Sequence, residues 1–384
     1  MTKKKKIIVI IGSLDVGGAE MDIVRNYPII NKTHDVTILL YSHPGKLADQ
    51  ITKAGVKVVA LKSPTNIIGR IAYKTKGLSF FAMLANCFLF LRSHIKSEQA
   101  DIIHAFLPLS YIYATFIKFT LPKPKPLLIM SRLSLNFYFA KHKIAAFLET
   151  KVCHKYVDRA VGNTKAILND LKKEGIPEEK LFLLYNGIEV DRFQLKRSLE
   201  DFKSAKILQM IAVGNLFTYK GHGDLLNALS ILKIKRPDLT WHLNIIGRNE
   251  EDNLERYQTF LKQHNMQENV SFVGASNDVF SFLKNSHLHI HPSHTEGLPN
   301  SIIEAMSSSI SCIATEVGGI PELIDHNKTG LIVPPKSPNA LSKAIEKMLS
   351  DREKLYNYGR AAEKKAKTTF GVKQSVARYL KLYN

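Results

Sequence analysis

Short, unbroken runs of apolar residues recur along the whole chain and alternate with helical stretches. Because these runs are continuous, they predict strands covered on both faces, as in the parallel sheets of α/β folds. Seven lie in the first half, at residues 7–11, 36–40, 56–60, 101–104, 127–130, 157–161 and 181–184. Six lie in the second half, at residues 207–213, 241–246, 270–273, 288–291, 310–314 and 331–333.

The two halves of the chain begin alike. The first run is followed by Gly12 and the pair Gly17-Gly18, and the run 207–213 by Gly214 and Gly221. A strand, a glycine-bearing loop and a helix thus occur twice, which predicts two doubly wound domains that divide near residues 186–204. A ligand would bind outside the carboxyl ends of the strands. The tail 351–384 is expected to form two helices that break near Phe370-Gly371.

The charge of the chain is basic and uneven. The net charge is +20 over 384 residues, and residues 1–185 carry 28 Lys and Arg against 13 Asp and Glu. A basic half indicates a polyanionic partner, such as nucleic acid, an acidic membrane face or a phosphorylated substrate. A lysine-rich surface without any partner would give the same composition.

Targeting and cysteine signals are weak. The scattered Cys87, Cys153 and Cys312 argue against a disulfide framework and against a zinc site. The first apolar run resembles a buried strand more than a signal peptide, and no run reaches the roughly 18 residues of a membrane span. We therefore expect a cytoplasmic protein.

Two carboxylates, Glu296 and Glu304, lie on either side of a Gly/Pro turn. We expect Glu304 on the first turn of the following helix, where unpaired N–H groups favour an anion. Carboxylates beside an anion site indicate a ligand that also carries hydroxyls. A sugar nucleotide carries both phosphates and hydroxyls.

The loop from Gly214 to Gly221 contains Lys220. A lysine there can act as a point charge for a diphosphate, although a plain surface lysine is an alternative. The two glutamates on a later loop of the same sheet favour the ligand role. The loop Gly17-Gly18-Ala19-Glu20 lets backbone approach a phosphate or only forms a tight turn, since it lacks the GxGxxG pattern.

Three histidines have more than one possible role. His289 and His291 would share one face of a strand, but nothing nearby has metal-ligand spacing, so we expect hydrogen-bonded histidines beside a polar cleft. His104 is expected just past a strand on the cleft rim, as an acid/base or sugar-positioning group, or else as a core histidine. No Asp-x-Asp pair is present to hold a metal on a nucleotide. Fixed cations and helix ends would therefore stabilise a leaving diphosphate.

Two segments combine aromatic and basic residues, at 69–96 and at 136–155. Helices of this composition can lie in a membrane interface. Core packing is the stronger interpretation for Phe80–Leu91, whereas both interpretations stay open for residues 136–155.

Taken together, these residues resemble the retaining family 4 glycosyltransferases, which have the GT-B fold. The resemblance covers nearly the whole chain and includes Glu296-x7-Glu304 and the Gly17-Gly18 loop. It also includes Val161-Gly162-Asn163-Thr164, Tyr185-Asn186-Gly187-Ile188, Lys220-Gly221, Phe272-Val273-Gly274 and Val317-Gly318-Gly319-Ile320-Pro321-Glu322.

The resemblance implies two Rossmann-like domains facing across a cleft, at 1–188 and 189–367, with 368–384 returning to the first. It implies a catalytic set of Lys220, Glu296 and His104. Lys220 would neutralise the donor diphosphate, Glu296 hold the sugar hydroxyls and Glu304 the ribose. The implied donor-binding residues are Gly17, Gly18, Gly214, Asn215, Lys220, Arg248, Glu296, Gly297, Leu298, Asn300, Ser301 and Glu304.

This chain departs from the family at Asn215, where an arginine is usual, and Arg248 or Arg132 would have to substitute. The expected activity is transfer of a hexose-type sugar from a nucleotide diphosphate sugar, without metal or cofactor. A UDP-sugar is the favoured donor. The acceptor would be a lipid-linked or cell-envelope oligosaccharide at the inner face of an anionic membrane, with no nucleic acid involved. A nucleotide-sugar epimerase and a non-catalytic polyanion-binding or membrane-binding protein are the alternatives.

Overall fold

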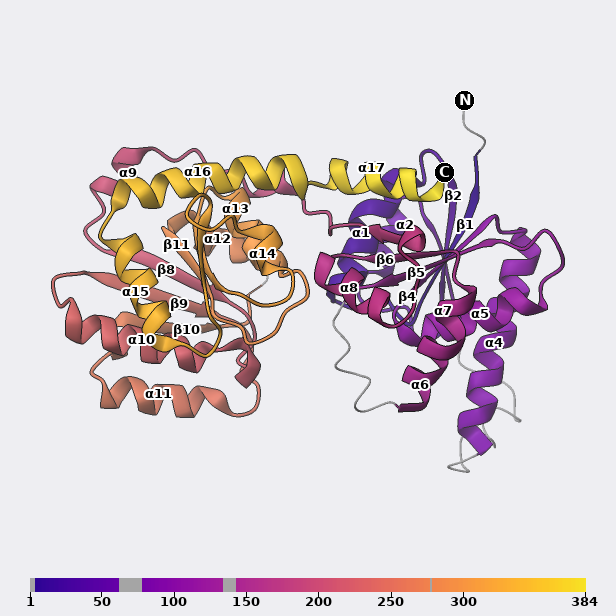
Figure 1. Cartoon of the computed structure of the whole chain (residues 1–384), viewed down its shortest axis with the longest axis horizontal. Helices are drawn as coiled ribbons and strands as arrows, with labels where there is room; N and C mark the ends of the chain where they lie inside the picture. The colour runs from indigo at the N-terminus through magenta and orange to yellow at the C-terminus, as the bar shows by residue number, and fades with distance from the viewer. Residues whose placement is uncertain (1–3, 62–77, 134–142, 277) are drawn as a thin grey trace. The chain divides into compact units, whose positions relative to one another are not determined.

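The computed structural model describes residues 4–61, 78–133, 143–276 and 278–384 (Figure 1). The chain divides into two compact units, unit 1 with Met1–Gly187 and Ser375–Asn384, and unit 2 with Ile188–Gln374. The return to unit 1 thus begins at Ser375, later than the 368 of the sequence analysis. A short bridge between Ile188 and Gly371 keeps the intervening stretch with unit 2.

Unit 1 alternates strands with helices. Its strands are β1 (Lys6–Ile11), β2 (Asp35–Leu40), β3 (Lys57–Ala60), β4 (Ile102–Phe106), β5 (Leu127–Arg132), β6 (Arg159–Gly162) and β7 (Leu181–Leu183). Its helices are α1 (Gly18–Ile30), α2 (Ala48–Lys53), α4 (Leu78–Glu98), α5 (Pro108–Thr120), α6 (Lys143–Leu148), α7 (His154–Tyr156) and α8 (Lys165–Lys173), with a π-helix η2 (Glu149–Cys153) and a 3₁₀ turn η3 (Glu178–Lys180).

Unit 2 repeats this alternation. Its strands are β8 (Leu208–Val213), β9 (Trp241–Ile246), β10 (Val270–Gly274), β11 (Leu288–His291), β12 (Ser311–Thr315) and β13 (Gly330–Val333). Its helices are α9 (Leu199–Lys203), α10 (His222–Lys235), α11 (Asn253–Gln263), α12 (Val279–Asn285), α13 (Asn300–Ser307), α14 (Ile320–Leu323), α15 (Pro338–Leu349) and α16 (Arg352–Thr369). The 3₁₀ turns are η4 (Val190–Phe193), η5 (Thr218–Lys220) and η6 (Gln267–Asn269), and α17 (Val372–Tyr383) closes the chain.

Both sheets have the doubly wound order that the apolar runs predicted. The seven-stranded sheet runs β3-β2-β1-β4-β5-β6-β7 and the six-stranded sheet β10-β9-β8-β11-β12-β13. The strand pairs are parallel throughout. Each of the thirteen apolar runs forms a strand, and the tail breaks between α16 and α17 as expected. In each sheet the strand order reverses beside the first strand, which is where such folds bind ligands.

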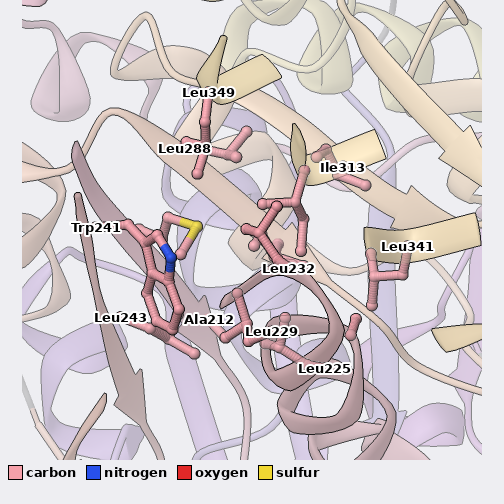
Figure 2. Packing of buried hydrophobic residues seen from close by; sticks show 14 of the residues in the cluster. Ala212, Leu225, Leu229, Leu232, Trp241, Leu243, Leu288, Ile313, Leu341 and Leu349 are labelled. Atoms are coloured by element: carbon pink, nitrogen blue, oxygen red, sulfur yellow. The ribbon is translucent and has the colours of Figure 1, made fainter. Parts of the chain in front are cut away.

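The core of unit 2 lies between its sheet and the helices that cover it. Figure 2 shows Leu225, Leu229 and Leu232 of α10 packed toward the strands that carry Ala212 and Leu243. The helix presents these leucines at spacings of three and four residues, so one apolar stripe meets the sheet. Among the described residues, no helix is long and apolar enough to cross a membrane.

Candidate functional site

The candidate site of unit 2 lies at the point where its strand order reverses. β8 and β11 are neighbours in the sheet, although β9 and β10 come between them in the chain. The loop after β8 carries Lys220, and the loop after β11 carries Glu296. Since parallel strands end at one edge of a sheet, the two loops meet there.

Lys220 ends the turn η5 and approaches the second loop closely. The next residue, Gly221, has φ +72° and is the N-cap residue of α10. A Cβ on Gly221 would lie 2.0 Å from the carbonyl oxygen of Pro292, so the packing of the two loops requires glycine. The Lys220 Nζ then reaches the Glu296 Oε1 at 2.7 Å.

The Glu296 carboxylate accepts three hydrogen bonds at the same oxygen. Besides Lys220, the donors are Ser293 Oγ at 2.7 Å and His291 Nε2 at 2.8 Å. Burial would raise the pKa of the Glu296 carboxyl, but the His291 bond and the Lys220 charge outweigh it and lower the pKa to about 2. Glu296 is therefore a carboxylate at any physiological pH.

The two strand histidines differ from the expectation that both would be hydrogen-bonded. His291 donates to Glu296, and its Nδ1 lies 3.5 Å from Ser301 Oγ. His289 is fully buried, and neither ring nitrogen has a hydrogen-bond partner in the described chain. That expectation is wrong for His289, because its side chain lies in the sheet core, where burial lowers the pKa of its ring well below the usual value. The expectation is confirmed for His291, although the alternating pattern did not reveal Glu296 as its partner.

The backbone around Glu296 is held by a glycine pair from another loop. The Gly319 N–H donates to the Gly297 carbonyl at 2.8 Å. Gly318 has φ +53°, and a Cβ there would lie 1.9 Å from the Glu296 carbonyl oxygen. The neighbouring Leu298 is buried, so the turn is anchored from both sides.

Helix α13 positions the remaining predicted residues of this motif. It begins at Asn300 and carries Ser301 in its first turn. Glu304 is the fifth residue and so lies in the second turn, not in the first as expected, because Pro299 ends the extended segment and Asn300 already has helical backbone. Glu304 is half-buried on this helix.

The loop after β8 carries Gly214 and Asn215, and Asn215 contacts Arg248, which follows β9. The Asn215 side-chain oxygen accepts from the Arg248 N–H at 3.0 Å. The His222 ring donates to the Gly214 carbonyl at 3.1 Å, and burial lowers the pKa of His222 to about 4, so the ring is neutral. The Arg248 side chain is 68% exposed and pairs with Glu250 at 3.5 Å. The backbone of Arg248 thus contacts the position that lacks the usual arginine, whereas its guanidinium extends to Glu250 and solvent.

Arg132 is the weaker of the two substitutes. Its side chain is 2% exposed and pairs with Glu149 and Glu174 in unit 1. Glu149, Glu174 and His154 have ligand atoms within 4.8 Å of one another. Arg132 already bonds both carboxylates, so a divalent cation there would meet its positive charge.

In unit 1 the sheet also reverses beside its first strand, and the predicted residues lie in the segment after β1 and on β4. Gly17 is the extended N-cap residue of α1, and Gly18 starts that helix. A Cβ on Gly18 would meet nothing within 4 Å.

His104 is not on a rim, as the sequence analysis expected. It lies within β4, because the strand continues to Phe106, and it is fully buried. Its Nε2 lies 2.7 Å from Ser131 Oγ, and its Nδ1 lies 3.0 Å from Tyr27 Oη and 2.7 Å from Tyr383 Oη. Burial lowers the pKa of His104 to about 3. The neutral ring joins the core of unit 1 to the C-terminal helix α17 in this structure.

Comparison with known proteins agrees with this fold. A family model for glycosyl transferases group 1 matches residues 191–365, and one for glycosyltransferase family 4 matches residues 29–192. The chain therefore belongs to the family 4 glycosyltransferases, a group of GT-B enzymes.

Individual relatives are distant. An uncharacterized glycosyltransferase of Haemophilus influenzae is 31% identical over 38% of this chain and 40% of that protein, so the chain spans well under half of its length in that match. A Campylobacter jejuni enzyme is 23% identical over 96% of this chain and 97% of its own. It is called N-acetylgalactosamine-N,N'-diacetylbacillosaminyl-diphospho-undecaprenol 4-alpha-N-acetylgalactosaminyltransferase.

A solved structure covers the same fold. The crystal structure of Anabaena Alr3699/HepE in complex with UDP superposes with a TM-score of 0.79 at 17% identity, over 99% of both chains.

Proposed function

We propose that this glycosyltransferase moves a hexose-type sugar from a nucleotide diphosphate sugar to a lipid-linked or cell-envelope oligosaccharide. The observation that carries the proposal is the partly buried pair of Lys220 and Glu296 on neighbouring loops, 2.7 Å apart. A cation and a carboxylate side by side suit a ligand that presents a phosphate and hydroxyls to the same place. A UDP-sugar is the first candidate donor, because the Anabaena protein of this fold was crystallised with UDP.

We infer that the reaction keeps the anomeric configuration and uses no protein nucleophile. The bond from the anomeric carbon to the phosphate oxygen would break while the acceptor oxygen attacks from the same face. The departing phosphate oxygen would take the acceptor proton. Lys220, with Arg248 in place of the missing arginine, would stabilise the diphosphate without a metal ion, and Glu296 would hold sugar hydroxyls.

The remaining donor contacts follow from the positions of the loops. Asn300 and Ser301, with the backbone of Gly297 and Leu298, would face the sugar and its phosphate, and Glu304 would take the ribose hydroxyls. Gly17, Gly18, Gly214 and Asn215 would let backbone approach the phosphates.

The acceptor proposal rests on charge and on one relative. Residues 1–185 carry the excess of basic side chains, and the Campylobacter enzyme has a diphospho-undecaprenol acceptor in its name. A lipid-linked acceptor would place the protein on the inner face of a membrane.

The test has two arms. A thermal-shift screen with UDP-, GDP- and ADP-sugars should raise Tm for one donor class, and that donor should then label a lipid-linked acceptor. The donor alone should not isomerise, because isomerised sugar without acceptor would indicate an epimerase. Polyanion binding with neither sugar release nor transfer would contradict the proposal.

A further inference from the structure

We propose that helices α4, α5, α6 and α7 of unit 1 form a surface that docks on a bilayer containing anionic lipids. Of the fourteen large apolar side chains that the described residues expose, nine come from this stretch of unit 1. We call them the apolar face: Phe81, Met83, Leu89, Leu109, Phe116, Phe119, Ile144, Phe147 and Tyr156. This concentration is more than scattered surface residues explain.

The helices of the apolar face contact one another. Helix α5 packs against α4 and against α6, and Figure 1 shows α4, α5, α6 and α7 in one region of unit 1. The Phe119 ring meets the Tyr156 ring edge-to-face at 4.5 Å, and Phe116 lies 6.3 Å from Phe119. The apolar face therefore includes a connected aromatic cluster where α5 ends.

Core packing does not account for these exposed side chains. Helix α4 buries Cys87, Leu91 and Ile95 in the core of unit 1. Phe81 and Leu89 are on the same helix but 71% and 61% exposed, so they remain apolar surface after the core has formed. Helix α4 therefore contributes both to core packing and to an exposed apolar surface, the two interpretations given in the sequence analysis. Residues 69–77 and 136–142 of the two aromatic and basic segments lie outside the described residues.

Lysines occur beside or on the helices of the apolar face. The Lys125 ammonium lies 5.8 Å from the centre of the Phe119 ring, and the exposed Lys143, Lys151 and Lys155 follow along α6, η2 and α7. Lysines can extend toward lipid phosphates while aromatic and aliphatic side chains enter the interface.

A bilayer suits this surface better than a second copy of the chain does. An isologous dimer would bring these lysines against their own copies, whereas anionic headgroups neutralise them. The inference deepens the proposed function, because a lipid-linked acceptor would lie at the docked surface. The docking inference relies on the proposed function only to explain why the protein would bind a membrane. Vesicle binding itself is measured without sugar transfer.

Co-sedimentation with vesicles tests the proposal. The full chain should bind phosphatidylglycerol/phosphatidylcholine vesicles and bind pure phosphatidylcholine much less. The double variant Ile144→Asp/Phe147→Asp should bind at least about tenfold more weakly, because both side chains would otherwise enter the interface. Ile234→Asp is the matched control, since Ile234 is 81% exposed on α10 of unit 2 and should leave binding unchanged.

The electrostatic contribution has its own variants. Lys151→Gln and Lys155→Gln should each weaken binding to anionic vesicles about fivefold at low salt. The control is Lys262→Gln, an exposed lysine on α11. Thermal unfolding checks that each variant folds, and Phe147→Ser provides a milder change if the double variant does not.

Three results would overturn the inference. One is a wild-type chain that ignores anionic vesicles at low salt, and another is a double variant that binds like wild type. The third is a dimer that the double variant turns into monomers without vesicle binding, because a second copy would then cover the apolar face. Transfer to a water-soluble acceptor should be unaffected in every variant, so loss of transfer would concern the proposed function instead.

Discussion

Glu296 directs one carboxylate oxygen toward the protein, and we propose that the other is the one that meets a ligand. Within the described chain, Lys220, His291 and Ser293 all bond its Oε1. An oxygen with three donors is saturated, so Oε2 is the atom that a donor hydroxyl would meet. The contacts therefore orient the side chain before any ligand binds, which lowers the cost of ordering it.

Lys220 is the residue whose loss should reduce the proposed activity most. We expect Lys220→Ala to lower kcat by about a hundredfold or more, because a fixed cation at a leaving diphosphate would be missing. Steady-state kinetics with the donor from the thermal-shift screen measures this. Lys262→Ala is the control on an exposed lysine. Near wild-type turnover of a folded Lys220→Ala protein would refute the role.

His291 should act as a positioning residue for Glu296. Removing it in His291→Ala takes away the leading hydrogen bond that lowers the pKa of Glu296, so that pKa rises from about 2. In the proposed function only the ionised form of Glu296 binds the donor, so the acid limb of the kcat/KM profile should move to higher pH. The rate at neutral pH should fall about tenfold, which is in the range expected when a residue that orients a functional side chain is removed.

His291→Gln supplies the control. The glutamine amide can still donate to Glu296, so this variant should keep an acid limb and a rate nearer to wild type. If the alanine and glutamine variants lose activity equally and the acid limb does not shift, then His291 does not position Glu296 and its role is only structural.

Among the elements, the loop that contains Gly318 determines whether the Glu296 turn can form. Gly318→Ala should cost roughly 2–4 kcal/mol of unfolding free energy, because it combines positive φ with a clash on a backbone oxygen. Urea denaturation measures this cost. Gly274→Ala isolates the strain, since Gly274 has φ +80° and open space around its Cβ position. It should cost about 1 kcal/mol. Equal losses in both variants would contradict the proposed packing against Glu296.

Apolar runs predicted the strands because parallel strands are buried on both faces and leave a continuous signal. The loops of the site were predicted from Lys220 and Glu296, since both follow strands that the topology makes neighbours. His104 was misplaced because a strand end cannot be located within two residues from an apolar run. The bond between His291 and Glu296 was missed because it depends on a turn conformation that residue types do not encode.

At the scale of the molecule, one buried carboxylate in unit 1 bonds both the residue where the chain leaves this unit and the helix that returns to it. Asp22 on α1 accepts from the Gly187 N–H at 3.2 Å and from the Tyr379 hydroxyl at 2.5 Å. Gly187 is the last residue before the chain leaves unit 1, and Tyr379 lies in the part of α17 that returns to it. Asn26 also donates to Asp22, at 2.9 Å, and Arg25 contributes a positive charge.

This carboxylate should make unit 1 less stable as the pH rises. Burial raises the pKa of Asp22 to about 6, against 3.8 for an ordinary aspartate, although Tyr379, Gly187 and Arg25 oppose the rise. Between these values the folded state holds a proton that the unfolded chain has lost. The stabilisation is therefore complete below pH 3.8 and lost as pH rises through 6, by about 3 kcal/mol.

Asp22→Asn should remove this pH dependence, because its amide oxygen still accepts hydrogen bonds but carries no proton to lose. We expect the free energy of unfolding of wild type to fall about 2.4 kcal/mol more than that of Asp22→Asn between pH 4 and pH 7. Urea-dependent hydrogen exchange of β1 and β4 reports on unit 1 alone. Asp49→Asn, an exposed aspartate on α2, should follow wild type. Parallel curves for wild type and Asp22→Asn would mean that Asp22 is ionised throughout, with its three donors outweighing the cost of burial.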